Sequence, residues 1–206
     1  NTVRNFIEEN AVHHNGDMSD ATGTNGGVLR GWTNNATNQE LTLNSSVYTL
    51  YSDVPEGSAA KKSLRVANTS AAYHPTAILP NRKYEISFWL KGDSYTDASG
   101  AVTTCAAKPA NIYVVLGRDK VSRFTGDTWN ANKYQYLNGT ENLGTTPNWT
   151  NDGTWQQYTA TYEWDYTGAD YELPYMWVIF RDPSSNGTNI SKTTYYITDL
   201  QINEVV

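Results

Sequence analysis

Stretches in which apolar and polar residues alternate recur along most of the chain. They lie at 84–91, 112–117, 157–162 and 176–181, with shorter ones at 47–51, 64–68 and 195–202. Successive side chains of a strand point to opposite faces, so a period of two is typical of strands with one buried face. No stretch shows the period of an amphipathic helix. The pattern predicts an all-β protein.

Turn signals separate these stretches. They are Asn-Gly at 15–16, 138–139 and 186–187, Pro-Asn at 80–81, and Gly-Asp at 92–93 and 126–127. Many short strands with such turns predict a two-sheet antiparallel β-sandwich of the jelly-roll type. The segments 93–110 and 117–154 are polar and weakly patterned, so we expect long loops there, where binding residues often lie. Residues 1–206 contain no internal repeat and no linker and fit a single domain.

The chain is rich in aromatic residues. The chain has 15 Tyr and 7 Trp, and charged residues make up only 17%. Aromatic residues are too abundant for a disordered chain. They also exceed what one core can bury, so we expect some of them to face solvent or a ligand.

The charge narrows the range of partners. The net charge is −6 and the pI is about 5.0. Nucleic acids and anionic membranes attract basic surfaces, so we expect neither as a partner. No apolar run is long enough to cross a bilayer. The negative net charge favours neutral ligands or cations.

Cysteine and histidine offer little catalytic chemistry. Cys105 is the single cysteine and is expected to be a buried or loop residue, because its neighbours supply no partner for a thiolate. His13, His14 and His74 are not spaced like a zinc motif. The chain begins at Asn1 without a signal peptide and is interpreted as an excised domain or mature fragment. Its richness in Asn and Thr favours an extracellular protein.

Several segments together resemble a known family. They are Asn15–Ser19 followed by Leu29–Thr33, Ser63–Ala67 with Tyr73 behind it, Tyr84–Lys91, Gly153–Tyr158 and Tyr196–Leu200. In this order they resemble the opening, the Ser-Leu-Lys-Val strand, the Tyr-x-Val-Ser-x-Trp strand and the closing strands of carbohydrate-binding modules of families four, nine and twenty-two. The resemblance runs from about residue 12 to the end, so residues 1–11 lie outside it.

The resemblance implies a galactose-binding-domain-like jelly roll without catalytic activity. Such modules bind xylan or β-glucans in a groove across one sheet. They are often attached to, or inserted within, a glycoside hydrolase such as a xylanase. We therefore expect a secreted or cell-surface, monomeric module that is tethered to a catalytic domain and binds a soluble polysaccharide, with xylan as the first candidate.

A sugar-binding face combines flat aromatic rings with side chains that hydrogen-bond to hydroxyls. If Met176, Val178 and Phe180 face the core, the alternate residues of that strand face outward. The predicted carbohydrate-binding residues are Tyr73, Tyr113, Trp177, Arg181 and Trp129. The alternative is that each of these rings packs beneath a loop.

The resemblance also implies a structural calcium ion. Its predicted ligands are Asp199 in the closing strand, Asp53 or Glu56 ahead of Ser63, and the opening motif, where Ser19 replaces the family's Glu. Calcium requires six to eight oxygen ligands, so Ser19 weakens the match unless Asp17 or Asp20 compensates. The alternative is a set of solvated turn acids.

Two further function classes stay open. A jelly-roll glycosidase or polysaccharide lyase needs carboxylates on both sides of the scissile bond. Glu163 and Asp165 share one strand face, and no acid can be placed opposite them. A surface adhesin that binds protein would use the same exposed aromatic residues, and the fold alone does not exclude it.

Overall fold

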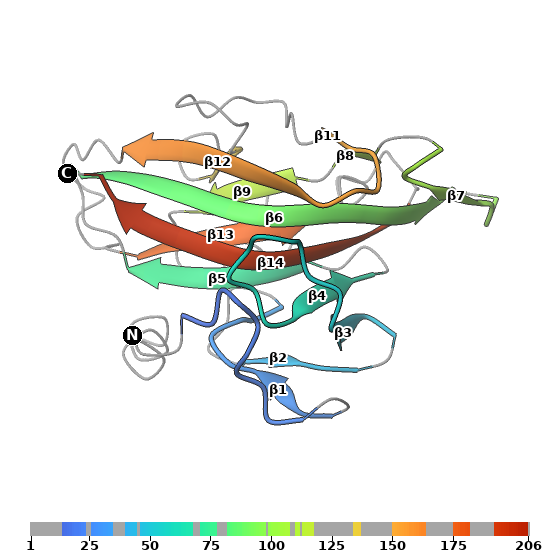
Figure 1. Ribbon diagram of the computed structural model, residues 1–206, viewed down its shortest axis with the longest axis horizontal. Helices are drawn as coiled ribbons and strands as arrows, with labels where there is room; N and C mark the ends of the chain where they lie inside the picture. The colour runs from blue at the N-terminus through green and yellow to red at the C-terminus, as the bar shows by residue number, and fades with distance from the viewer. Residues whose placement is uncertain are drawn as a thin grey trace.

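A computed structural model shows a chain built of strands (Figure 1). The described residues are 14–23, 26–34, 40–44, 46–67, 71–77, 82–97, 99–107, 110–111, 113–117, 134–136, 150–163, 175–181 and 192–205. The strands are β1 (Val28–Leu29), β2 (Leu41–Thr42), β3 (Tyr48–Tyr51), β4 (Ser63–Val66), β5 (Ala71–Ala77), β6 (Lys83–Thr96), β7 (Val102–Thr104), β8 (Ala110–Asn111), β9 (Tyr113–Gly117), β10 (Tyr134–Tyr136), β11 (Thr150–Asn151), β12 (Gln156–Glu163), β13 (Tyr175–Arg181) and β14 (Lys192–Glu204). No helix among these residues is long and apolar enough to cross a membrane.

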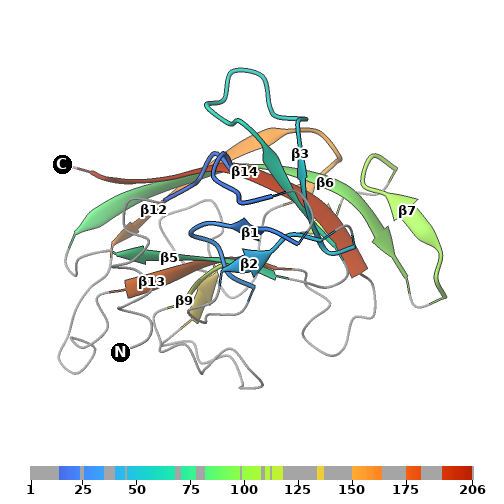
Figure 2. The same ribbon diagram turned by 90° about the horizontal axis from the view of Figure 1, so that it is seen from below.

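Two antiparallel sheets form the layers of a β-sandwich, as Figure 2 shows from the side. One sheet has the strand order β12-β6-β14-β4-β3, with β7 paired to β6. The other has the order β10-β9-β13-β5. Two short pairs, β1-β2 and β11-β8, complete the strands. The expected two-sheet antiparallel jelly roll is confirmed.

The core lies between the two sheets and follows the alternation in the sequence. The larger sheet contributes Leu64, Phe88 and Tyr195, which are fully buried. The smaller sheet contributes Val178 and Phe180, also fully buried. Burying such side chains contributes about 1.5–3 kcal/mol each. The prediction that Val178 and Phe180 face the core is confirmed.

The prediction of a loop at 93–110 is partly wrong. β6 continues to Thr96, and β7 turns back to pair with it. Gly92, predicted as part of a turn, lies within β6, where a Cβ atom would come within 2.8 Å of the Cys105 sulfur. This glycine therefore permits a close approach between segments. Cys105 itself is buried, as expected.

Candidate functional site

Strand β13 lies between β5 and β9, and its register defines the two faces of the smaller sheet. Val178 and Phe180 belong to the core. The positions that alternate with them, 177, 179 and 181, therefore belong by register to the opposite face of this sheet. This is the face on which a sugar-binding surface was predicted.

The register brings four predicted binding positions onto these three strands. Position 177 pairs with Pro75 and Gly117, position 179 with Tyr73 and Val115, and position 181 with Ala71 and Tyr113. The positions of Trp177, Tyr73, Arg181 and Tyr113 thus occupy three adjacent rows of one face. Trp129 lies outside the described residues.

Strand β10 adds two tyrosine positions that the sequence analysis missed. Tyr136 pairs with Val115 and Tyr134 with Gly117, so both positions extend rows of the same face. The signal was the alternation Tyr-Gln-Tyr at 134–136. It was not recognised because it is a three-residue strand inside a segment expected to be a loop.

Two side chains of the middle row, those of Tyr73 and Ile179, are shielded from solvent. Tyr73 is only 8% exposed and Ile179 is fully buried. The backbone of Tyr73 is held by two hydrogen bonds with Thr33, in which each N–H donates to the other residue's carbonyl, at 2.9 and 2.8 Å. Any ligand on this face would therefore meet the two flanking rows before the ring of Tyr73.

A histidine pair lies behind the opposite face of β5. The Nε2 of His74 donates to the carbonyl of His14, and the Nε2 of His14 donates to the carbonyl of Leu200, both at 2.7 Å. The ring of Trp32 lies 5.1 Å from that of His74. Burial, and to a lesser extent the nearby charge of His14, lowers the pKa of His74 to about 3. These hydrogen bonds connect the opening segment to β5 and to β14.

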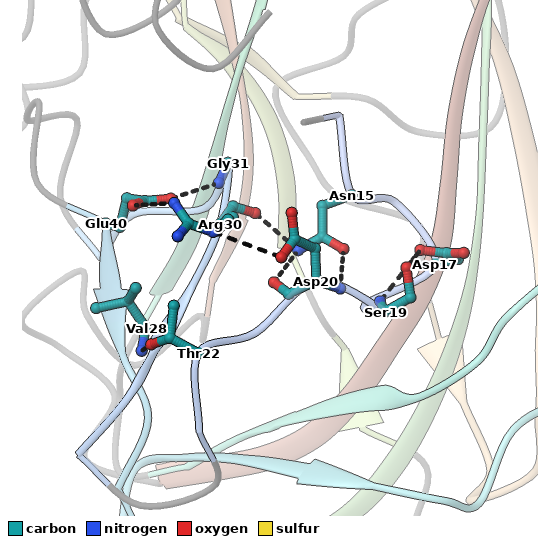
Figure 3. Close-up of polar contacts among 9 residues, drawn as sticks. All are labelled: Asn15, Asp17, Ser19, Asp20, Thr22, Val28, Arg30, Gly31 and Glu40. Atoms are coloured by element: carbon teal, nitrogen blue, oxygen red, sulfur yellow. Dashed lines mark hydrogen bonds and ion pairs between the residues drawn. The ribbon is translucent and has the colours of Figure 1, made fainter. Parts of the chain in front are cut away.

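The opening segment is ordered by polar contacts (Figure 3). The amide nitrogen of Asn15 donates to the carbonyls of Asp20 and Arg30, at 2.9 and 2.7 Å. The guanidinium of Arg30 then lies between two carboxylates, 3.5 Å from Asp20 and 3.8 Å from Glu40. Glu40 also accepts from the N–H of Gly31 at 3.1 Å. These contacts hold the Asn-Gly and Gly-Trp motifs of the resemblance together.

The three segments predicted to hold calcium meet at one corner. The carbonyl of Asp17 accepts from the N–H groups of Lys61 and Lys62, at 3.1 and 3.2 Å. The N–H of Leu200 donates to the carbonyl of Gly16 at 3.1 Å. The opening motif, the segment ahead of Ser63 and the closing strand therefore lie side by side, as the resemblance implies.

Asp199 occupies this corner in an unusual conformation. Its φ is 53°, a left-handed value that is uncommon for a residue other than glycine, and its side chain is buried. One carboxylate oxygen accepts from the N–H of Ala59 at 3.4 Å, and the other accepts from the amide of Gln201 at 3.0 Å. Such a conformation persists only where the surroundings enforce it.

Among the other predicted calcium ligands, Asp53 and Ser19 have other partners and Glu56 is exposed. Asp53 forms an ion pair with Lys91, whose hydrogen bond lowers the pKa of the carboxyl, and Glu56 is exposed. The hydroxyl of Ser19 donates to Asp17 at 2.7 Å. Within the described residues, no group of three or more acidic, histidine or cysteine side chains could hold a metal ion. Calcium therefore stays a prediction from the resemblance.

Neither of the two acids considered for a hydrolase has a described side chain. Glu163 ends β12, and the structure does not describe its side chain. Asp165 lies outside the described residues.

No protein-family model matches the chain, and no curated protein matches it. Among solved structures, the CBM22-1–GH10 modules of endo-1,4-β-D-xylanase 10B from Clostridium thermocellum, complexed with xylohexaose, are similar over 92% of this chain and 29% of that chain, with 13% identity and a TM-score of 0.48. A CBM4 structure is similar over 85% of this chain and 95% of that one, with 14% identity and a TM-score of 0.44. The enzymatically active domain of tailspike protein 4 from bacteriophage CBA120 is similar over 85% of this chain and 19% of that one, with 11% identity and a TM-score of 0.44.

These similarities span a CBM4 structure, modules of a xylanase and an enzymatically active tailspike domain. This chain covers less than a third of both the xylanase and the tailspike chains. Because one architecture supports many functions, function must be argued from the residues of this chain.

Proposed function

We propose that this chain is a non-catalytic carbohydrate-binding module that binds a soluble plant cell-wall polysaccharide, with xylan as the first candidate. The observation that supports this best is the register of β5, β13 and β9. It places the positions of Trp177, Arg181, Tyr113 and Tyr73 in adjacent rows, alternating with the core residues Val178 and Phe180. The resemblance in sequence points to the same sheet.

The chemistry of the four residues suits a sugar chain. A pyranose ring presents C–H groups on its faces, which an indole or phenol ring covers, and hydroxyls around its edge. A guanidinium has five N–H donors for those hydroxyls. Because Tyr73 and Ile179 are covered, contact should concentrate at the two flanking rows, at Trp177 on one side and at Arg181 with Tyr113 on the other.

The biological setting follows from the resemblance. A module of this kind would be extracellular and monomeric, and it would hold a tethered glycoside hydrolase against its polysaccharide. The net charge of −6 agrees with a neutral polymer better than with a polyanion.

Affinity electrophoresis tests the proposal. Gels that contain soluble xylan, mixed-linkage β-glucan, mannan or galactan should retard the protein in at least one case, with xylan tried first, while a non-binding protein of similar size migrates unchanged. The absence of retardation in all four would contradict binding. Release of reducing sugar by protein free of contaminating enzymes would contradict the non-catalytic part and favour a glycosidase. A lyase would instead release unsaturated products that absorb in the ultraviolet.

A further inference from the structure

The larger sheet carries a second cluster of aromatic and charged side chains on its outer face. Arg65, Tyr196 and Lys91 lie in one register row across β4, β14 and β6. The residues that precede or follow them face the core, namely Leu64, Ile197 and Leu90. Trp155 precedes Gln156, which pairs with Leu90, so it lies next to Lys91 at the end of this row. Tyr51 ends the edge strand β3.

Ring contacts join these residues into one surface, which we call the Tyr51–Trp155 patch: Tyr51, Arg65, Lys91, Trp155 and Tyr196. The ring of Tyr196 lies 5.5 Å from that of Tyr51 and 6.2 Å from that of Trp155, measured between centroids. Lys91 Nζ lies 4.8 Å from the centroid of Tyr196 and 5.3 Å from that of Trp155. Its ammonium is thereby fixed between the two rings.

The patch is accessible. Tyr51 is 39% exposed, one of three large hydrophobic residues found exposed in the described part of the chain. The side chains of Arg65 and Lys91 are 25% and 22% exposed. The segment between β3 and β4 rises beyond the outer face of this sheet (Figure 2), and it carries Asp53, which binds Lys91. Asp53 of this segment therefore lies at the margin of the patch, against Lys91.

Each of the two cations in the patch is paired with a neighbouring carboxylate. Asp53 pairs with Lys91, and Asp93 lies 3.9 Å from Arg65. Two cations therefore face two anions, so these four groups together carry no net charge that would select an anionic ligand. Exposed pairs of this kind contribute little to folding stability. They do offer donors and acceptors side by side, which is what the hydroxyls of a neutral sugar require.

One donor in the patch lacks a good partner. The indole N–H of Trp155 is shielded from solvent and makes no hydrogen bond of normal geometry to any described atom, although it lies close enough to Asp53 to lower the pKa of that carboxyl. A polar group left in this state costs stability and calls for an explanation. The indole N–H of Trp155 and the carboxylate of Asp53 thus lie close together at the patch.

We infer that the Tyr51–Trp155 patch is a second glycan-binding surface that takes a neutral sugar chain. It lies on the larger sheet, whereas the proposed groove lies on β5, β13 and β9 of the smaller sheet. Tyr51 and Tyr196 supply ring surface, and the pairs Arg65–Asp93 and Lys91–Asp53 supply hydrogen bonds. The choice of a glycan as ligand rests on the proposed function, while the location of the surface does not. Two surfaces on opposite sheets would let one module contact two chains of a cell-wall polymer and gain avidity from both.

An NMR titration of the ¹⁵N-labelled protein tests this inference. Xylohexaose, cellohexaose and mannohexaose are added in turn, and backbone amide shifts are followed at Tyr51, Arg65 and Tyr196 and, separately, along β13. At least one oligosaccharide should shift the patch amides with a saturable curve. Tyr51→Ala should weaken that curve at least about tenfold, because binding energy concentrates in exposed aromatic anchors. It should leave any shifts along β13 unchanged.

Two further variants make the outcomes distinct. Thr159→Ala, an exposed substitution on the same sheet, should change neither set of shifts. Trp177→Ala should abolish the β13 shifts and preserve those of the patch. Patch amides that do not move with any of the three sugars, or that move equally in Tyr51→Ala, would overturn the inference even if β13 responds. Patch shifts without any β13 response would support the inference and contradict the proposed groove.

Discussion

The ring of Phe88 in β6 meets the ring of Phe180 in β13 edge-on, with 5.0 Å between their centroids and an interplanar angle of 83°. Edge-to-face pairs contribute more than the burial of their area alone. The contact joins the two sheets of the sandwich. It also fixes which face of β13 is buried, and therefore which face carries position 177.

Removing this contact should destabilise the fold. Phe88 is fully buried, so Phe88→Ala leaves a cavity between the sheets and should lower the free energy of unfolding by about 3–5 kcal/mol. Urea unfolding followed by tryptophan fluorescence measures the change. Phe88→Leu, which retains most of the volume, should cost less than half as much. Equal losses for both variants, or a loss below about 1 kcal/mol for Phe88→Ala, would contradict this packing.

Burial of His74 should make stability fall in mild acid. Its pKa is about 3 in the fold and about 6.5 in an unfolded chain, so the unfolded state binds the proton first. The stabilisation is complete above about pH 6.5 and is lost as the pH falls toward 3. Between pH 6.5 and 4.5 this should remove about 2–3 kcal/mol from the free energy of unfolding, at about 1.4 kcal/mol per pH unit.

A variant separates His74 from other titrating groups. His74→Gln keeps a neutral donor for the carbonyl of His14 and cannot take up a proton in this range. Chemical unfolding at several pH values should give a flatter profile between pH 6.5 and 4.5 for this variant than for the wild type. If the two profiles have the same slope, His74 is not the group that links stability to pH.

The calcium prediction has a thermal test. An ion that binds the native state raises the melting temperature, so EDTA should lower it and added calcium should restore it. Asp199→Asn tolerates the left-handed backbone and keeps a carbonyl oxygen, but it removes the charge. It should reduce the response to calcium. An unchanged melting temperature in EDTA would reject the prediction and leave Asp199 as a residue held by Ala59 and Gln201 alone.

The alternation in the sequence predicted the strands that have one buried face. β6, β12 and β13 each alternate clearly and were predicted, although β6 extends beyond the predicted stretch 84–91 to Thr96. β5 was missed because its sequence, Ala-Ala-Tyr-His-Pro-Thr-Ala, carries a proline and little apolar contrast. It is a strand because β13 pairs with all seven of its residues, which is a tertiary effect that local propensity does not contain.

The alternation of side chains along a strand predicted which face of β13 carries the candidate site, but not which residues of that face are exposed. Parity assigned Trp177 and Arg181 to the face opposite Val178 and Phe180, in agreement with the register of β13. It could not tell that Tyr73 and Ile179, on the same face, would be covered, because burial there depends on segments distant in sequence. The Tyr51–Trp155 patch was missed for the same reason, since its residues come from four strands and from the residue that precedes β12.

The most direct test of the central claim is isothermal titration of wild type and Trp177→Ala with xylohexaose and with the polymer that retards the wild type most. The wild type should bind with a dissociation constant between about micromolar and millimolar, or about −8 to −4 kcal/mol. Trp177→Ala should lose at least about tenfold in affinity at the groove while its melting temperature stays near that of the wild type, and Val102→Ala, exposed on β7, should bind normally. Unchanged affinity in a folded Trp177→Ala variant, or no binding by the wild type to any of the polysaccharides, would contradict the account.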